Sequence, residues 1–180
     1  SRAVLPLAAL VIASPARAQR RQQPLNFSVA VGVGQPIGDF DRYAGTGFGV
    51  TVRTERSGSD MPWTLRGGLS LDRFTGKAGY GVSNYQYLTF ATDLVHHTGD
   101  KLYQFAGVGL YQVRTTSSTN GASAGPPLSG GGQGRSESAF GFQAGVGYNF
   151  TTKGTVKTFA EVGIVDVLTS GSARVWFPVR

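Results

Sequence analysis

The chain has 180 residues and no cysteine, so we expect one domain and exclude both a disulfide framework and a thiolate metal site. Charged residues make up 15% of the chain, against about a quarter in a typical soluble protein, which indicates that part of the surface does not face water. The net charge is +7, but the basic residues are scattered. Without a basic patch or a known module we do not expect nucleic-acid binding.

The beginning of the chain has the pattern of an export signal. Residues 3–13 (AVLPLAALVIA) are apolar, Pro15 follows, and an A-x-A cleavage site ends at Ala18. The apolar run is shorter than the roughly 20 residues that a transmembrane helix needs. We therefore expect residues 1–18 to be a signal peptide and residues 19–180 to form one domain.

Apolar and polar residues alternate along the rest of the chain, which is typical of half-buried β-strands. The expected segments, in chain order, are 25–34, 48–53, 63–72, 85–96, 102–113, 140–150, 157–164 and 174–180. In residues 85–96 we assign one face to Leu88, Phe90, Thr92 and Leu94, which places Tyr87 and Asp93 on the opposite face. Residues 102–113 are apolar on both faces, so the pattern does not say which side of that strand faces inward.

The connections between these segments alternate in length. Residues 35–46, 75–84 and 115–135 are long connections, and residues 55–62, 98–101 and 151–155 are short ones. An outer-membrane barrel shows this rhythm, with short turns in the periplasm and long loops outside. No later segment is apolar enough for a spanning helix, and a membrane protein without such helices must be a closed barrel.

Three stretches resemble the small outer-membrane β-barrel proteins, the family that includes the outer-membrane protein A and X barrels. They are residues 31–40 (VGVGQPIGDF), 105–111 (FAGVGLY) and 176–179 (WFPV). The resemblance implies an all-β, eight-stranded, antiparallel up-and-down transmembrane barrel in the outer membrane of a Gram-negative cell envelope. It also implies contact with outer-membrane lipids and with the barrel-assembly machinery, which reads a final aromatic residue. This chain stops at Arg180, so the last strand is expected to be cut short.

The apolar faces of the expected strands contain almost no charged residues, and the opposite faces carry six. They are Arg53, Arg66, Asp72, Asp93, Lys157 and Glu161. An Arg or Lys facing lipid costs about 2–4 kcal/mol at the midplane of the bilayer, so the apolar face should meet lipid and the charged face should line the lumen. An eight-stranded barrel is just wide enough for its own side chains. We therefore expect a lumen ion-pair network in which Arg53, Arg66 and Lys157 meet Asp72, Asp93 and Glu161. The alternative for Arg53 and Asp72 is a position at a strand end, in water.

Other patterns do not indicate a catalytic, cofactor or metal site. The glycines Gly32, Gly34 and Gly38 lack the spacing of a dinucleotide-binding loop. His96 and His97 are neighbours in a strand and should point to opposite faces, so they are not expected to bind one metal. The aromatic residues Tyr80, Tyr85, Tyr87, Trp63 and Tyr103 are candidates for the girdles at the two membrane interfaces.

The expected function is a structural or surface-interaction role without enzymatic activity, with loops available to an extracellular ligand. Two alternatives stay open: a narrow, porin-like pore or carrier of a small hydrophobic molecule, and a soluble lipocalin-like ligand-binding barrel. In a lipocalin the apolar face would line the cavity, and alternation alone does not separate the two.

Overall fold

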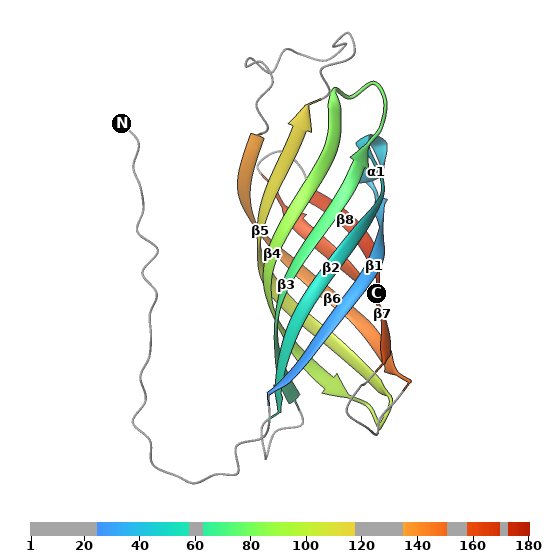
Figure 1. Ribbon diagram of the computed structural model, residues 1–180, viewed down its shortest axis with the longest axis vertical. Helices are drawn as coiled ribbons and strands as arrows, with labels where there is room; N and C mark the ends of the chain where they lie inside the picture. The colour runs from blue at the N-terminus through green and yellow to red at the C-terminus, as the bar shows by residue number, and fades with distance from the viewer. Residues whose placement is uncertain (1–24, 58–62, 118–134, 151–157, 170–172) are drawn as a thin grey trace, which may run out of the picture.

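The computed structural model describes residues 25–57, 63–117, 135–150, 158–169 and 173–180, and it is a closed barrel of eight strands. Each strand pairs antiparallel with the next one along the chain, and β8 closes the barrel against β1 (Figure 1). The strands are β1 (Asn26–Ile37), β2 (Ala44–Ser57), β3 (Trp63–Gly76), β4 (Val82–His97), β5 (Leu102–Ser117), β6 (Arg135–Asn149), β7 (Phe159–Leu168) and β8 (Ala173–Val179). The predicted fold class is therefore confirmed. The expected signal peptide, the connection 118–134 and Lys157 lie outside the described residues.

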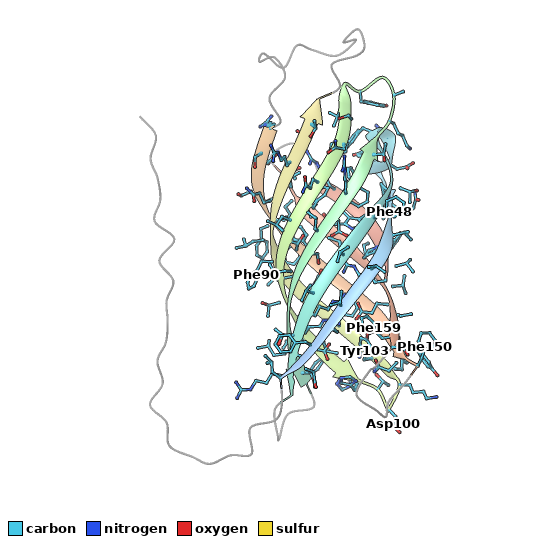
Figure 2. The ribbon with its side chains drawn as sticks, in the orientation of Figure 1. Phe48, Phe90, Asp100, Tyr103, Phe150 and Phe159 are labelled. Atoms are coloured by element: carbon cyan, nitrogen blue, oxygen red, sulfur yellow. The ribbon has the colours of Figure 1, made fainter. Side chains whose placement is uncertain are left out.

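The alternation seen in the sequence is an alternation between the outside and the inside of the barrel. The side chains of Phe27 and Phe48 are 75% and 72% exposed, whereas Thr51 and Arg53 on the opposite face are 2% and 5% exposed. Figure 2 shows Phe48, Phe90 and Phe150 on the outer wall. The apolar face thus forms a band around the barrel, and the polar face lines the lumen.

The inward face of β5, which the sequence left open, carries aromatic rings. Tyr103, Phe105 and Tyr111 are buried in the lumen, and Leu110 points outward. The neighbouring strand makes room for these rings, because a Cβ on Gly147 of β6 would overlap the Tyr103 ring. Large inward side chains on β5 therefore require small inward residues on β6, which accounts for part of the high glycine content.

Most strands are longer than the 9–11 residues that the bilayer requires. Strands β1 to β6 contain 12 to 16 residues, because pairing continues beyond the apolar band. Two expected long loops are short as a result: the helix α1 (Asp39–Tyr43) joins β1 to β2, and residues 77–81 join β3 to β4. The contrast in connection length is therefore weaker than the sequence predicts.

The barrel has its shortest strand at its closure. β8 has 7 residues and pairs with β1 over Val33–Ile37. In the part of the chain that the structure describes, residues 26–32 of β1 pair with β2 alone.

No helix in the described residues has the length and apolarity to cross a membrane.

An arginine on the outer wall should be costly at mid-strand. Leu69 of β3 is 55% exposed on the apolar band, so Leu69→Arg is expected to lower the free energy of unfolding in lipid vesicles by about 2–4 kcal/mol. The control Thr116→Arg, on the exposed end of β5, should change it by about 1 kcal/mol or less. A urea titration measures both values, and equal tolerance of the two changes would mean that the band faces water.

Candidate functional site: the barrel lumen and its loop end

The middle of the lumen holds a network of buried ion pairs around Arg66 of β3. Its Nε donates to Oδ2 of Asp93 on β4 at 2.8 Å, and its Nη1 donates to Oε1 of Glu161 on β7 at 2.7 Å. Glu161 also pairs with Nη1 of Arg53 on β2 at 2.5 Å. All four side chains are at most 6% exposed. The charges therefore join strands on opposite sides of the lumen, across its width.

The structure brings together four of the six residues expected in this network: Arg53, Arg66, Asp93 and Glu161. Asp72 lies in the lumen but pairs with Nη2 of Arg180, at 3.4 Å, instead of with these arginines. The alternative that Arg53 and Asp72 lie in water at strand ends is wrong, because each is 5% exposed.

Neutral side chains complete the network, and the sequence did not single them out. The hydroxyl of Tyr103 donates to Oε1 of Glu161 at 2.7 Å, and Nε2 of Gln143 donates to Oδ1 of Asp93 at 2.5 Å. The centroid of the Phe105 ring lies 4.3 Å from Cζ of Arg66, which is a cation–π contact. Gln143 could have been found, because it lies on the face of its strand that was expected to point inward. The sequence did not place Tyr103 and Phe105 in the lumen, because both faces of β5 are apolar.

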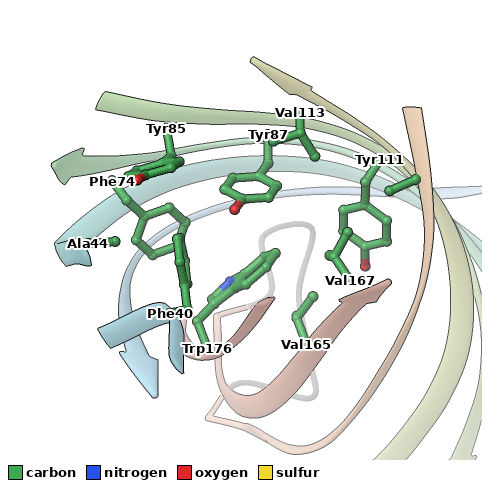
Figure 3. Close-up of a cluster of buried hydrophobic side chains, with 11 residues drawn as sticks. Phe40, Ala44, Phe74, Tyr85, Tyr87, Tyr111, Val113, Val165, Val167 and Trp176 are labelled. Atoms are coloured by element: carbon green, nitrogen blue, oxygen red, sulfur yellow. The ribbon is translucent and has the colours of Figure 1, made fainter. Parts of the chain in front are cut away.

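Beyond the network, at the end of the barrel that carries α1 (the loop end), the lumen is filled by an aromatic cluster (Figure 3). Its centre is Phe40 of α1, which is fully buried. Four rings from the strands lie around it with centroid distances of 5.3 to 6.2 Å, namely Phe74, Tyr85, Tyr87 and Trp176. The helix thus inserts an aromatic side chain into the mouth of the barrel. The sequence predicts a loop here, because one helical turn leaves too short a periodicity to detect.

The burial of three tyrosines corrects the expected aromatic girdles at the membrane interfaces. Tyr85, Tyr87 and Tyr103 are buried in the lumen, and of the five candidates Trp63 and Tyr80 are exposed. Successive residues of a strand point to opposite faces, so a residue next to one of these tyrosines faces the lipid. The prediction was therefore wrong about the face of the strand on which the tyrosines lie.

The helix α1 is also tied to the neighbouring hairpin between β3 and β4. The backbone N–H of Lys77 donates to the carbonyl oxygen of Tyr43 at 2.8 Å, and Nζ of Lys77 lies 3.0 Å from Oδ1 of Asp41. The Tyr43 and Tyr80 rings are 6.0 Å apart. Two connections at the loop end therefore form one connected surface.

The opposite end of the lumen contains a polar cavity of about 400 Å³. It is lined by Asn26, Phe27, Ser28, Val29, Arg53, Glu55, Val95, His97, Tyr103, Asn149, Phe159 and Glu161. Figure 2 shows Tyr103 and Phe159 at this end. Since Arg53 and Glu161 line the cavity, its inner end is the ion-pair network.

The two histidines contact different aromatic rings on opposite faces of β4. The His96 ring packs against Trp63 with a centroid distance of 4.6 Å, and the His97 ring packs against Tyr103 with a centroid distance of 5.6 Å. Trp63 is on the outer wall and Tyr103 in the lumen, so the histidines point to opposite faces. Among the described residues no three His, Asp or Glu side chains are grouped as metal ligands.

Comparison with known proteins agrees with this architecture. Residues 6–170 match the family described as the outer membrane protein beta-barrel domain. Among solved structures, the chain is similar to Ail, the attachment invasion locus protein of Yersinia pestis, in complex with the heparin analogue sucrose octasulfate. The two chains share 13% sequence identity with a TM-score of 0.52, and the alignment covers 85% of this chain and 93% of that chain. Neisserial surface protein A is similar with 14% identity and a TM-score of 0.55, covering 87% of this chain and 96% of that chain.

At 13% and 14% sequence identity, the similarity to these structures shows a shared fold. Curated proteins gave no match. The family match covers most of the chain, and the closed barrel with its outer apolar band has the architecture that the family requires. The chain therefore belongs to the outer-membrane β-barrel protein family, and it is a transmembrane barrel of the bacterial outer membrane.

Proposed function

We propose that this barrel is a surface-interaction protein whose lumen is plugged and whose loop end binds an extracellular ligand. Residues 1–18 direct export and are removed, and residues 19–180 form the barrel. The barrel-assembly machinery inserts it among the outer-membrane lipids. The protein carries out no catalysis in this proposal.

The observation that carries the proposal is the double obstruction of the lumen. The network of Arg53, Arg66, Asp93 and Glu161 crosses the middle of the barrel, and the aromatic cluster around Phe40 fills the mouth above it. Passage of a solute would require both layers to rearrange. A partner outside the cell would then contact the side chains of the loop end.

The described loop end offers a firm platform for such a partner. Helix α1 is anchored by Phe40 below and tied to Lys77 at its side. Arg42 and Tyr80 are exposed on top of this platform. Because the platform is held in place before binding, a ligand would lose little free energy in ordering it.

The orientation of the loop end can be tested with single cysteines, since the chain has none of its own. Ala78→Cys lies in the hairpin between β3 and β4, and Asp100→Cys lies in the turn between β4 and β5, at the opposite end. A thiol reagent that does not cross membranes should label position 78 in intact cells and position 100 only after lysis. Labelling of position 100 alone in intact cells would invert the proposed orientation.

The ligand class is suggested by the structure of Ail with a heparin analogue. We therefore choose heparin as the first probe and compare cells that produce the wild-type barrel with cells that produce the Arg42→Ala, Tyr80→Ala variant. Wild-type cells should retain heparin, and the variant should retain several-fold less at equal surface amounts. No retention by wild-type cells would exclude this ligand class.

A narrow pore is the second candidate, and the 400 Å³ cavity at the turn end favours it. The cavity is polar and ends at the ion-pair network, so a channel would need the network to part and the aromatic cluster to shift. Electrical recording separates the two functions.

A further inference from the structure

Three successive rows of outward side chains cross strands β3 to β6 towards the loop end. Directly paired residues on neighbouring strands share a face of the sheet, so each row can be followed through the registers. The first row is Leu69, Phe90, Leu110 and Phe140; the second is Leu71, Leu88, Gln112 and Ser138; the third is Arg73, Gln86, Arg114 and Ser136. The wall therefore changes from apolar to basic and polar within two rows.

The two arginines of the third row are not neutralised by any carboxylate in the described part of the chain. Arg73 and Arg114 are exposed, and neither forms an ion pair with a carboxylate of the described residues. The connection between β5 and β6, residues 118–134, contains no Asp or Glu. Both positive charges are thus available to an external anion.

The wall is hollowed beside Arg114. A depression of about 380 Å³ is lined by Gln86, Leu88, Gln112, Arg114 and Ser136. Its lining combines a guanidinium, two amides and a hydroxyl, all of which donate hydrogen bonds, with one apolar side chain that continues into the band below. Guanidinium groups bind phosphate oxygens in a bidentate geometry, with two parallel N–H···O hydrogen bonds.

We propose that this basic row binds the phosphate of an anionic lipid headgroup in the outer leaflet, with Arg73 and Arg114 on either side of Gln86. The assignment to the outer leaflet rests on the orientation proposed above. The site lies on the outer wall directly above Leu88 and Phe90, so a lipid whose phosphate occupies it places its acyl chains along the apolar band. A soluble anion would use the same donors but would gain nothing from that band.

The test measures lipid binding by native mass spectrometry of the refolded full chain in detergent. The probe is phosphatidic acid, and the reference is phosphatidylcholine, a zwitterion whose phosphate is balanced by its choline cation. The variant is Arg73→Gln, Arg114→Gln, and the matched control is Arg56→Gln, Lys101→Gln, which removes two exposed positive charges at the opposite end. Each surface arginine contributes about 1 kcal/mol to attraction of anionic lipid, so the variant should bind phosphatidic acid about thirtyfold more weakly.

The expected result is that wild type and control prefer phosphatidic acid and the variant does not. Equal binding by the variant and the control would overturn the proposal. So would displacement of the lipid by inorganic phosphate or heparin at matched anion concentration, because the site would then recognise soluble anions or sulfated polysaccharide. Heat-modifiable migration on a gel confirms that each variant is folded. Cysteine labelling at positions 78 and 100 reports on the orientation separately, so failure of the lipid site and failure of the proposed function can be told apart.

Discussion

Replacement of Arg66 by leucine is expected to lower the free energy of unfolding by about 3–5 kcal/mol, which is the usual cost of leaving buried charges without their partner. Arg66 is 1% exposed and pairs with both Asp93 and Glu161. Its removal leaves Asp93 with the amide of Gln143 alone, and Glu161 with Arg53 and Tyr103. Urea titration in lipid vesicles, followed by tryptophan fluorescence, measures the loss.

Arg56→Leu is the matched control, because Arg56 is an exposed arginine on the neighbouring strand β2. It should change the free energy of unfolding by about 0.5 kcal/mol or less. The double variant Arg66→Leu, Asp93→Leu should lose less than the sum of the two single changes, since the first change already removes the partner of the second. Equal small effects of Arg66→Leu and Arg56→Leu would mean that the lumen charges are solvated and do not form a stabilising network.

Replacement of Phe40 by alanine should cost about 3–5 kcal/mol, as is usual for deleting a fully buried phenylalanine. Phe40 contacts the rings of Phe74, Tyr85, Tyr87 and Trp176, and it is the buried residue of α1. The change therefore also releases the helix from the mouth of the barrel. Urea titration measures the stability, and limited proteolysis between β1 and β2 measures the release of the helix.

Arg42→Ala is the control for the helix itself. Arg42 pairs with Asp39 at 3.5 Å, and both side chains are mostly exposed, so the loss should be about 0.5 kcal/mol. If Phe40→Ala left both stability and proteolysis at the level of Arg42→Ala, α1 would not be held by the aromatic cluster.

The side of the wall that each residue occupies was predictable wherever a strand carried one polar and one apolar face. Phe140 and Phe142 against Gln143, or Leu88 and Phe90 against Tyr87, are sorted by the period of two alone. Strand β5 was not predictable in this way, because Tyr103, Phe105 and Tyr111 fill the lumen with apolar rings. Their direction depends on the space left by Gly147 and its neighbours on β6, which is a property of the paired strands and not of one strand.

The charged residues of the lumen were predictable by type and side, but not their partners. Arg66, Asp93 and Glu161 lie on three strands, and the register between strands decides which charges meet. Asp72 illustrates the limit: it pairs with Arg180, from the far end of the chain, rather than with an arginine of the network. The anchoring of α1 by Phe40 was equally out of reach, since it depends on rings that β3, β4 and β8 bring together in the lumen.

The plugged lumen is the central claim, and single-channel recording in planar bilayers tests it most directly. If the lumen is plugged as we propose, the purified full chain should insert without producing a stable conductance, because an ion would have to displace both the ion-pair network and the aromatic cluster. A stable, reproducible conductance step at moderate voltage would contradict the claim and establish the barrel as a pore.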